Sequence, residues 1–151
     1  MIVLPLTKGY VTLLSDIDVE VCNISWHYCN GYAAARIKGK IIYLHRYLMN
    51  PQEGLEVDHV NGDKRDNRRE NLRVCTHRQN MCNWDNRRGI SKFRGVSWSK
   101  ARSKWIAQIQ VDGVSRRIGR FNSEEEAARA YDAAAIKLFG EFARPNFKEI
   151  A

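Results

Sequence analysis

Alternating hydrophobic and polar residues predict several short strands in the first third of the chain. A segment rich in β-branched and aromatic residues follows the Lys8-Gly9 turn and predicts a strand at 9–14. Two further strands are expected at 32–37 and 41–45, where Lys38-Gly39-Lys40 forms a tight hairpin turn. The chain is therefore expected to open with short, mainly antiparallel strands.

Two short helices are expected beside these strands. Ser15 is a suitable N-cap for an acidic helical segment at 16–21. A second helix at 45–49 should end at Asn50, because the residue before Pro51 disfavours helical geometry.

The next part of the chain predicts the order strand, polar loop, strand, helix. Residues 52–71 are dense in Asp, Asn, Gly and charge, which is typical of a loop. Within and after this loop, short strands are expected at 55–60 and 72–74. Thr76 and Gln79 have the spacing of a capping box, so a helix is expected from there to about residue 84.

A new pattern begins after a polar stretch that predicts a linker at 89–92, and the predicted domains are 1–88 and 93–151. The second domain is expected to have strands at 93–98, 105–111 and 115–121. Ser123 and Glu126 form another capping box, which predicts a helix that ends at Gly140. Strands and helices in both domains predict the α+β class.

Composition narrows the possible partners. The chain has 151 residues, 44% of them hydrophobic, which suffices for one ordinary domain or two small ones. No apolar run approaches the ~20 residues that cross a bilayer, and no export signal is expected, so we predict a cytoplasmic protein. The four cysteines are then expected to be reduced thiols, and their C-x6-C spacing is unlike that of structural zinc sites.

The net charge of +8 is concentrated in two blocks. Residues 64–88 hold eight Lys/Arg against three Asp/Glu, and residues 93–122 hold seven against one. Residues 1–44 are almost balanced, with four against three. Basic blocks interspersed with aromatic residues favour nucleic acid as the partner.

The loop region also carries a set of residues suited to phosphodiester hydrolysis. Such a reaction needs a base that activates water and a cation that stabilises charge on the phosphate. His59 offers an imidazole, which accepts protons near neutral pH, and Asp58 and Asn80 offer oxygen ligands of the kind Mg²⁺ prefers. Asp58 and His59 are neighbours on a predicted strand, so their side chains point to opposite sides.

The ordered elements Asp58-His59, Asn71-Leu72 and Asn80, together with Leu44-His45-Arg46, resemble the HNH nuclease family over residues 40–84. The resemblance implies a ββα-metal fold in which His59 is the general base and Asp58 and Asn80 hold the metal, Mg²⁺ or Mn²⁺. It also implies that Asn71 pins the loop through backbone hydrogen bonds. His45 is expected to be structural, and His77 remains an alternative metal ligand.

The second domain resembles the AP2 DNA-binding family over residues 92–147. The resemblance is carried by Phe93-Arg94-Gly95-Val96-Ser97-Trp98, Lys104-Trp105-Ile106-Ala107-Gln108-Ile109, Ile118-Gly119-Arg120-Phe121 and Ala127-Ala128-Arg129-Ala130-Tyr131-Asp132. It implies a three-stranded sheet in the major groove, backed by one helix. The expected DNA contacts on the polar face are Arg94, Lys104, Gln108, Gln110 and Arg117. Ser97, Ser99, Gln110 and Ser115 replace arginines of many plant members, so no target sequence is carried over.

These observations predict a metal-dependent DNA endonuclease of the homing or phage type, with an AP2 module that holds it on double-stranded DNA. We expect a monomer or weak dimer, with no membrane association, acting on DNA in a bacterial or phage-infected cell. Two alternatives remain open. One is a non-catalytic DNA-binding regulator that keeps the HNH fold as a scaffold, and the other is a zinc-organised adaptor.

Overall fold

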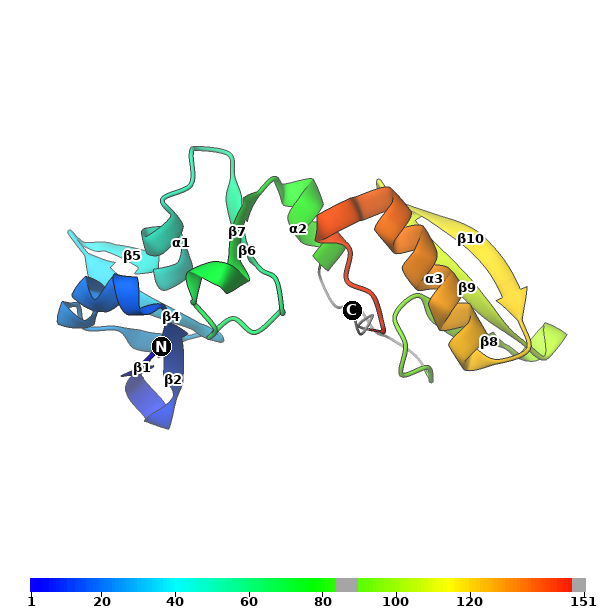
Figure 1. Ribbon diagram of the computed structural model, residues 1–151, viewed down its shortest axis with the longest axis horizontal. Coiled ribbons are helices and arrows are strands. Elements are labelled where there is room, and N and C mark those ends of the chain that lie inside the picture. The colour runs from blue at the N-terminus through cyan, green and yellow to red at the C-terminus, as the bar shows by residue number, and fades with distance from the viewer. Residues whose placement is uncertain (84–89, 148–151) are drawn as a thin grey trace. The chain divides into compact units, whose positions relative to one another are not determined.

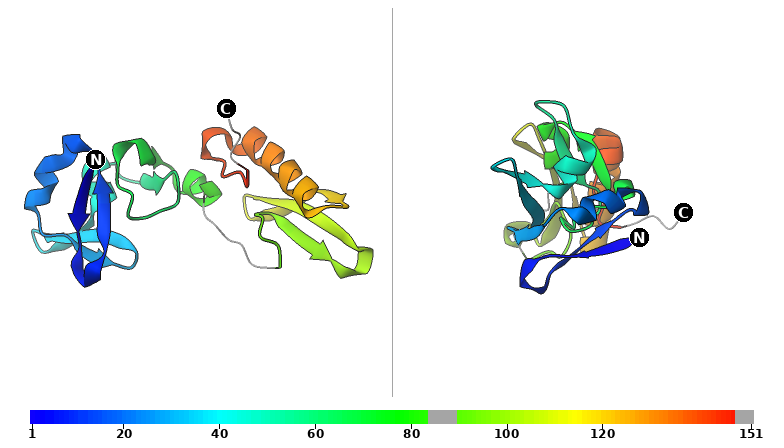
Figure 2. Two further views of the ribbon diagram at one scale, coloured as in Figure 1. Left: turned by 60° about the horizontal axis from the view of Figure 1, so that its bottom comes forward. Right: turned by 90° about the vertical axis from the view of Figure 1, so that its left-hand side faces the viewer.

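The computed structural model describes residues 1–83 and 90–147, and it divides into two compact units, Met1–Asn80 and Met81–Ala151. Each unit contains small antiparallel sheets or a single sheet with helices, which confirms the predicted α+β class (Figures 1 and 2). Within the described residues, no helix has the length and apolar character needed to span a membrane.

The N-terminal unit contains two small sheets before its central loop. Strands β1 (Ile2–Pro5) and β2 (Val11–Leu14) form an antiparallel pair. Strands β3 (His27–Cys29), β4 (Tyr32–Ile37) and β5 (Lys40–Tyr43) form a second sheet in the order β3-β4-β5. The core beneath them is apolar and includes Leu14, Trp26, Ala33, Ala35 and Leu44.

The rest of this unit confirms the predicted order of strand, loop, strand and helix. After α1 (Leu44–Met49), strand β6 (Glu56–His59) pairs antiparallel with β7 (Leu72–Cys75), and α2 (His77–Asn83) follows. The capping box of α2 is present, because the Thr76 amide donates to the Gln79 side chain at 2.8 Å and the Gln79 amide donates to the Thr76 hydroxyl at 3.3 Å. The predicted end of this helix near residue 84 lies outside the described residues.

The second unit is a three-stranded antiparallel sheet with one long helix. Strands β8 (Val96–Ser99), β9 (Lys104–Val111) and β10 (Val114–Phe121) lie in the order β10-β9-β8. Helix α3 (Glu124–Phe139) lies across one face of the sheet (Figure 1). Its core consists mainly of alanines and sheet residues, among them Ala107, Ile109, Ala127, Ala128 and Ala135.

Both predicted ends of α3 are confirmed. Ser123 and Glu126 form a reciprocal capping box, and Gly140 ends the helix with a φ of 54°. Close packing of helix and sheet depends on Gly95, where a Cβ atom would lie 2.0 Å from the Tyr131 ring. A glycine is therefore required at this position.

Some local predictions were wrong. Strands β1 and β3 were not predicted, because they are only four and three residues long. The segment predicted as a helix at 16–21 is a 3₁₀ helix at Asp16–Asn23, and Ser15 makes no cap hydrogen bond. The Ser15 hydroxyl instead accepts the Arg69 amide at 2.9 Å, a long-range partner that no local pattern reveals.

The beginning of the second unit also differs from the prediction. Strand β8 starts at Val96 rather than at residue 93. Ser91, which was expected in a linker, is buried and donates its hydroxyl proton to the Glu124 carboxylate at 2.7 Å. The segment around Ser91 is therefore anchored to the first residue of α3.

Candidate active site and nucleic-acid interface

His59 ends strand β6 and is buried, with 6% of its surface exposed. Its Nε2 atom lies 3.2 Å from the side-chain oxygen of Asn67. Burial lowers the pKa of His59 below its ordinary value, although the Asn67 hydrogen bond and nearby carboxylates oppose this shift. The imidazole is therefore neutral at pH 7, the state in which it can accept a proton.

An aromatic cluster surrounds one side of His59. The His45 ring meets the His59 ring edge-on with centroids 5.0 Å apart, and Tyr32 lies 6.2 Å from His59. The Lys64 ammonium lies 4.4 Å from the centre of the Tyr32 ring. Burial, followed by the charge on His59, lowers the pKa of His45 to about 3. His45 is thus a neutral, packed side chain, in agreement with the structural role expected for it.

Asp58 is buried beside its cross-strand neighbour Arg73. The Nε and Nη2 atoms of Arg73 donate to Oδ2 of Asp58 at 2.9 and 2.6 Å. A buried carboxylate needs such compensation, because an isolated charge is costly to desolvate. The register of β6 and β7 therefore places a guanidinium directly on the predicted metal ligand.

The side chain of Asn80 contacts Glu56 of strand β6. The side-chain amide of Asn80 donates to one carboxylate oxygen of Glu56 at 2.6 Å, and the other oxygen lies 2.8 Å from Nδ1 of His77. Hydrogen bonds from Asn80 and then His77 lower the pKa of Glu56. Glu56 and Asp58 are two residues apart on one strand, so they share a face of β6.

No role was predicted for Glu56, although alternation along β6 places it on the same face as Asp58. Glu56, Asp58 and Asn80 supply carboxylate and amide oxygens, which suit Mg²⁺. The residues that the structure describes contain no group of three His, Cys, Asp or Glu side chains arranged to hold a metal. A Mg²⁺ ion held by one or two protein oxygens, waters and a substrate phosphate is compatible with this donor set.

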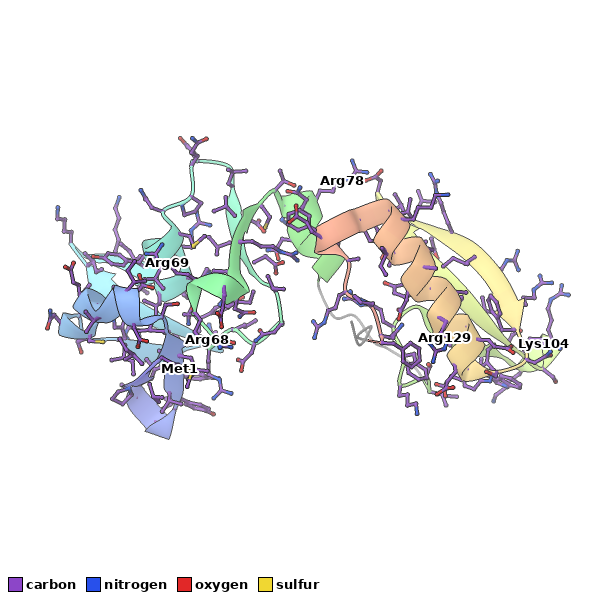
Figure 3. All side chains as sticks on the ribbon, in the orientation of Figure 1. Met1, Arg68, Arg69, Arg78, Lys104 and Arg129 are labelled. Atoms are coloured by element: carbon purple, nitrogen blue, oxygen red, sulfur yellow. The ribbon has the colours of Figure 1, made fainter. Side chains whose placement is uncertain are left out.

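Asn71 braces the loop between β6 and β7. Its side-chain oxygen accepts the Asn61 amide at 2.9 Å, and its side-chain nitrogen donates to the Asp66 carbonyl at 2.7 Å. Arg68 in turn donates to both carboxylate oxygens of Asp66 at 2.8 Å, which lowers the pKa of Asp66. Figure 3 shows Arg68 and Arg69 on the segment that leads into β7.

The second unit has an open polar strand face opposite α3. Cross-strand pairs on this face are Gln108 with Arg117 and Gln110 with Ser115. The alternate residues of β9 pack toward the helix, so the side chains of Gln108 and Gln110 are left exposed. Repulsion from Arg102, which lies in the turn before β9, and then from Arg117 on β10 lowers the pKa of Arg120.

Two of the predicted contact residues on this unit have local partners. The Lys104 ammonium contacts the Asn122 side chain, and the side-chain amide of Gln110 donates to the Gly113 carbonyl at 3.3 Å. Figure 3 shows Lys104 at the end of the sheet where β9 begins.

Arg94 lies two residues before β8 and has partners within the second unit. Its guanidinium donates to the Cys82 carbonyl at 3.0 Å and hydrogen-bonds the Tyr131 side chain of α3. The adjacent Gly95 lies against Tyr131, and its carbonyl accepts the Gln108 amide of β9 at 2.8 Å.

Comparison with known families agrees with this geometry. The HNH endonuclease model matches residues 50–82, and the AP2 domain model matches residues 91–141. The residues that match the HNH endonuclease model, 50–82, are called the HNH segment, and the residues that match the AP2 domain model, 91–141, are called the AP2 domain. The HNH segment includes Asp58, His59, Asn71 and Asn80, and the AP2 domain includes all three strands of the second sheet and α3.

Individual relatives divide in the same way. The chain is 32% identical over 127 residues to the uncharacterized HNH endonuclease L560 of Acanthamoeba polyphaga mimivirus, which covers 78% of this chain and 63% of that protein. It is 45% identical over 64 residues to dehydration-responsive element-binding protein 2C of Arabidopsis thaliana, covering 41% of this chain and 18% of the plant protein. APETALA2-like protein 2 of rice is 48% identical over 63 residues, or 40% of this chain and 14% of that protein. The chain thus spans less than two thirds of each relative.

Proposed function

We propose that this chain is a metal-dependent DNA endonuclease whose AP2 domain holds the HNH segment on double-stranded DNA. The observation that carries this proposal is that a buried, neutral His59 directly follows the buried carboxylate of Asp58 in the sequence of strand β6, and that Asn71 braces the loop after this strand. A general base and an oxygen ligand for a metal are what phosphodiester hydrolysis requires.

In this proposal each residue has a distinct task. His59 accepts the proton of the attacking water, which its neutral state permits. Asp58 and Asn80 would hold the divalent metal, with Mg²⁺ favoured and Mn²⁺ an alternative, and the ion would supply charge stabilisation at the scissile phosphate and the leaving oxygen. Asn71 keeps the loop in place through its bonds to Asn61 and Asp66.

The AP2 domain is proposed to supply target selection. Gln108, Gln110, Arg117 and Lys104 lie on the open strand face or at its end, where amides and guanidinium groups can contact base edges and phosphates. Tethering such a reader to the HNH segment raises the local concentration of the nuclease at its target. Arg94, the fifth proposed DNA contact, also links the segment before β8 to Tyr131 of α3.

The biological setting follows from the same proposal. A small basic nuclease with its own DNA reader fits a homing or phage-type enzyme that acts as a monomer or weak dimer. The experiment that tests the activity is cleavage of supercoiled plasmid with Mg²⁺ or Mn²⁺, comparing wild type, His59→Ala and the control His27→Ala. His27 lies on β3 and belongs to neither proposed site.

We expect metal-dependent nicking or linearisation by the wild type and the His27→Ala variant. The His59→Ala variant should bind DNA but not cut it. A wild-type protein that binds DNA and cuts no substrate with either metal would instead favour the non-catalytic regulator.

A further inference from the structure

A buried chain of polar side chains connects the N-terminal strand β2 with His59. Thr12 of β2 and Asn67 of the central loop are both 0% exposed. The side-chain nitrogen of Asn67 donates to the Thr12 hydroxyl at 2.8 Å, and the side-chain oxygen of Asn67 lies 3.2 Å from Nε2 of His59. Thr12 is far outside the HNH segment at 50–82.

The direction of each hydrogen bond between Thr12 and His59 can be worked out from the Thr12 end of the series. The Thr12 hydroxyl lies 2.7 Å from the backbone carbonyl of Arg65, which can only accept a hydrogen bond. The single hydroxyl proton of Thr12 is therefore used on Arg65, and Thr12 can only accept from Asn67. The atom of Asn67 that faces Thr12 must then be the NH₂ group, which turns its carbonyl oxygen toward His59.

We propose that Thr12 and Asn67 are positioning residues that hold His59 as the Nε2–H tautomer and leave the lone pair on Nδ1. A carbonyl oxygen facing Nε2 requires a proton on that nitrogen, and in a neutral imidazole the other nitrogen is then the acceptor. The catalytic meaning of this tautomer rests on the proposed function, because Nδ1 would be the atom that accepts the proton of water.

The series Thr12, Asn67 and His59, here called the relay, is held in place by backbone hydrogen bonds. The Leu13 amide donates to the Arg65 carbonyl at 2.9 Å, and the Asn67 amide donates to the Leu13 carbonyl at 2.9 Å. Strand β2 is thus paired to the loop directly beside Thr12 and Asn67, and Leu13 forms a parallel bridge with Asp66. The N-terminal hairpin β1-β2 therefore orients the proposed base as well as completing the core.

Comparing the variants Thr12→Val and Thr12→Ser separates the effect of the Thr12 hydroxyl from the effect of the side-chain volume. Valine has nearly the shape of threonine but no hydroxyl, whereas serine keeps the hydroxyl. Partners one step removed from reacting groups typically contribute roughly 10- to 100-fold. We expect Thr12→Val to lower the kcat of DNA cleavage by about this factor with little change in KM, and Thr12→Ser to remain within about threefold of the wild type.

The decisive readout is the ¹⁵N NMR spectrum of the His59 ring in the full-length chain, without DNA or metal. We expect a protonated Nε2 and an unprotonated Nδ1 in the wild type and in Thr12→Ser, and a mixture of tautomers in Thr12→Val. A protonated Nδ1 in the wild type, or an unchanged tautomer in a folded Thr12→Val, would overturn the proposal. The wild-type spectrum decides the tautomer even if Thr12→Val does not fold.

The same experiment distinguishes this inference from the proposed function. If the ring has the expected tautomer but no metal allows the wild type to cut DNA, the endonuclease proposal fails while the relay stands. If the wild type cuts DNA with the other tautomer, the endonuclease proposal stands and the relay fails.

Discussion

Replacing Arg73 by methionine tests whether Asp58 is a metal ligand. The side chains of Asp58 and Arg73 are 6% and 15% exposed, and their closest atoms are 2.6 Å apart. Arg73→Met keeps much of the side-chain volume but leaves a buried carboxylate without its cation. Breaking a buried ion pair by removing one partner costs about 3–5 kcal/mol, and we expect a loss of about 3 kcal/mol because Arg73 is partly solvated.

A divalent metal should restore part of this loss. If Asp58 binds Mg²⁺, the ion replaces the missing guanidinium, and binding at 100 times the Kd adds about 2.7 kcal/mol to the free energy of unfolding. In the wild type the gain should be smaller, because Mg²⁺ must displace Arg73 from the carboxylate. In this interpretation the Asp58 carboxylate pairs either with the Arg73 guanidinium or with a bound Mg²⁺ ion.

Arg69→Met is the matched control. Arg69 binds Asp18 at 2.7 Å, and the Asp18 side chain is 4% exposed, but this pair lies outside the proposed metal site. The control should lose less stability, because the Arg69 side chain is 46% exposed, and Mg²⁺ should not recover it.

The assay is urea unfolding with and without Mg²⁺, followed by NMR signals of strands β6 and β7. Recovery of Arg73→Met but not of Arg69→Met supports the ligand assignment. Equal Mg²⁺ effects on both variants, or none on Arg73→Met at concentrations that support cleavage, would refute the reasoning.

Three further predictions concern the loop, the second unit and acid stability. Asn71→Ala removes partners of the Asn61 amide and the Asp66 carbonyl, so we expect a loss of about 2–4 kcal/mol and faster hydrogen exchange at the Asn61 amide. Gly95→Ala places a Cβ atom 2.0 Å from Tyr131 at a φ of 72°, and the combined clash and strain should lower the stability of the second unit by about 2–4 kcal/mol in thermal unfolding. Burial lowers the pKa of His45 to about 3, so between pH 6.5 and pH 3 the His45 side chain is protonated in the unfolded chain but not in the folded protein. Stability should therefore fall by up to about 1.4 kcal/mol per pH unit as the pH is lowered through this range, and urea titrations of His45→Phe should show a flatter slope.

Local patterns were sufficient to predict most helices and strands. The Thr76 and Ser123 capping boxes and the Gly140 helix end were predicted correctly, because each depends on residues within one helical turn. The strand that contains Asp58 and His59 was also predicted from neighbouring residues, and the structure places both on β6.

Long-range partners could not be predicted from the sequence. The relay from Thr12 to His59 depends on β2 pairing with a loop more than fifty residues later in the chain, and no local signal encodes this contact. The hydrogen bonds of Arg94 to Cys82 and Tyr131 are likewise long-range, since these partners lie twelve or more residues away in the sequence. The hydrogen bonds between Glu56 and the side chains of His77 and Asn80 on α2 also depend on the approach of the helix to the strand.

The proposed function requires that one chain both selects and cuts DNA. The most direct test is sequencing of the DNA ends produced from a genomic fragment library by the wild type and by an Arg117→Gln, Gln108→Ala variant of the open strand face. We predict that wild-type ends cluster at a fixed distance from one sequence, and that the variant still cuts but scatters its ends. Wild-type ends that are already scattered, or a variant that keeps the same cluster, would contradict the account.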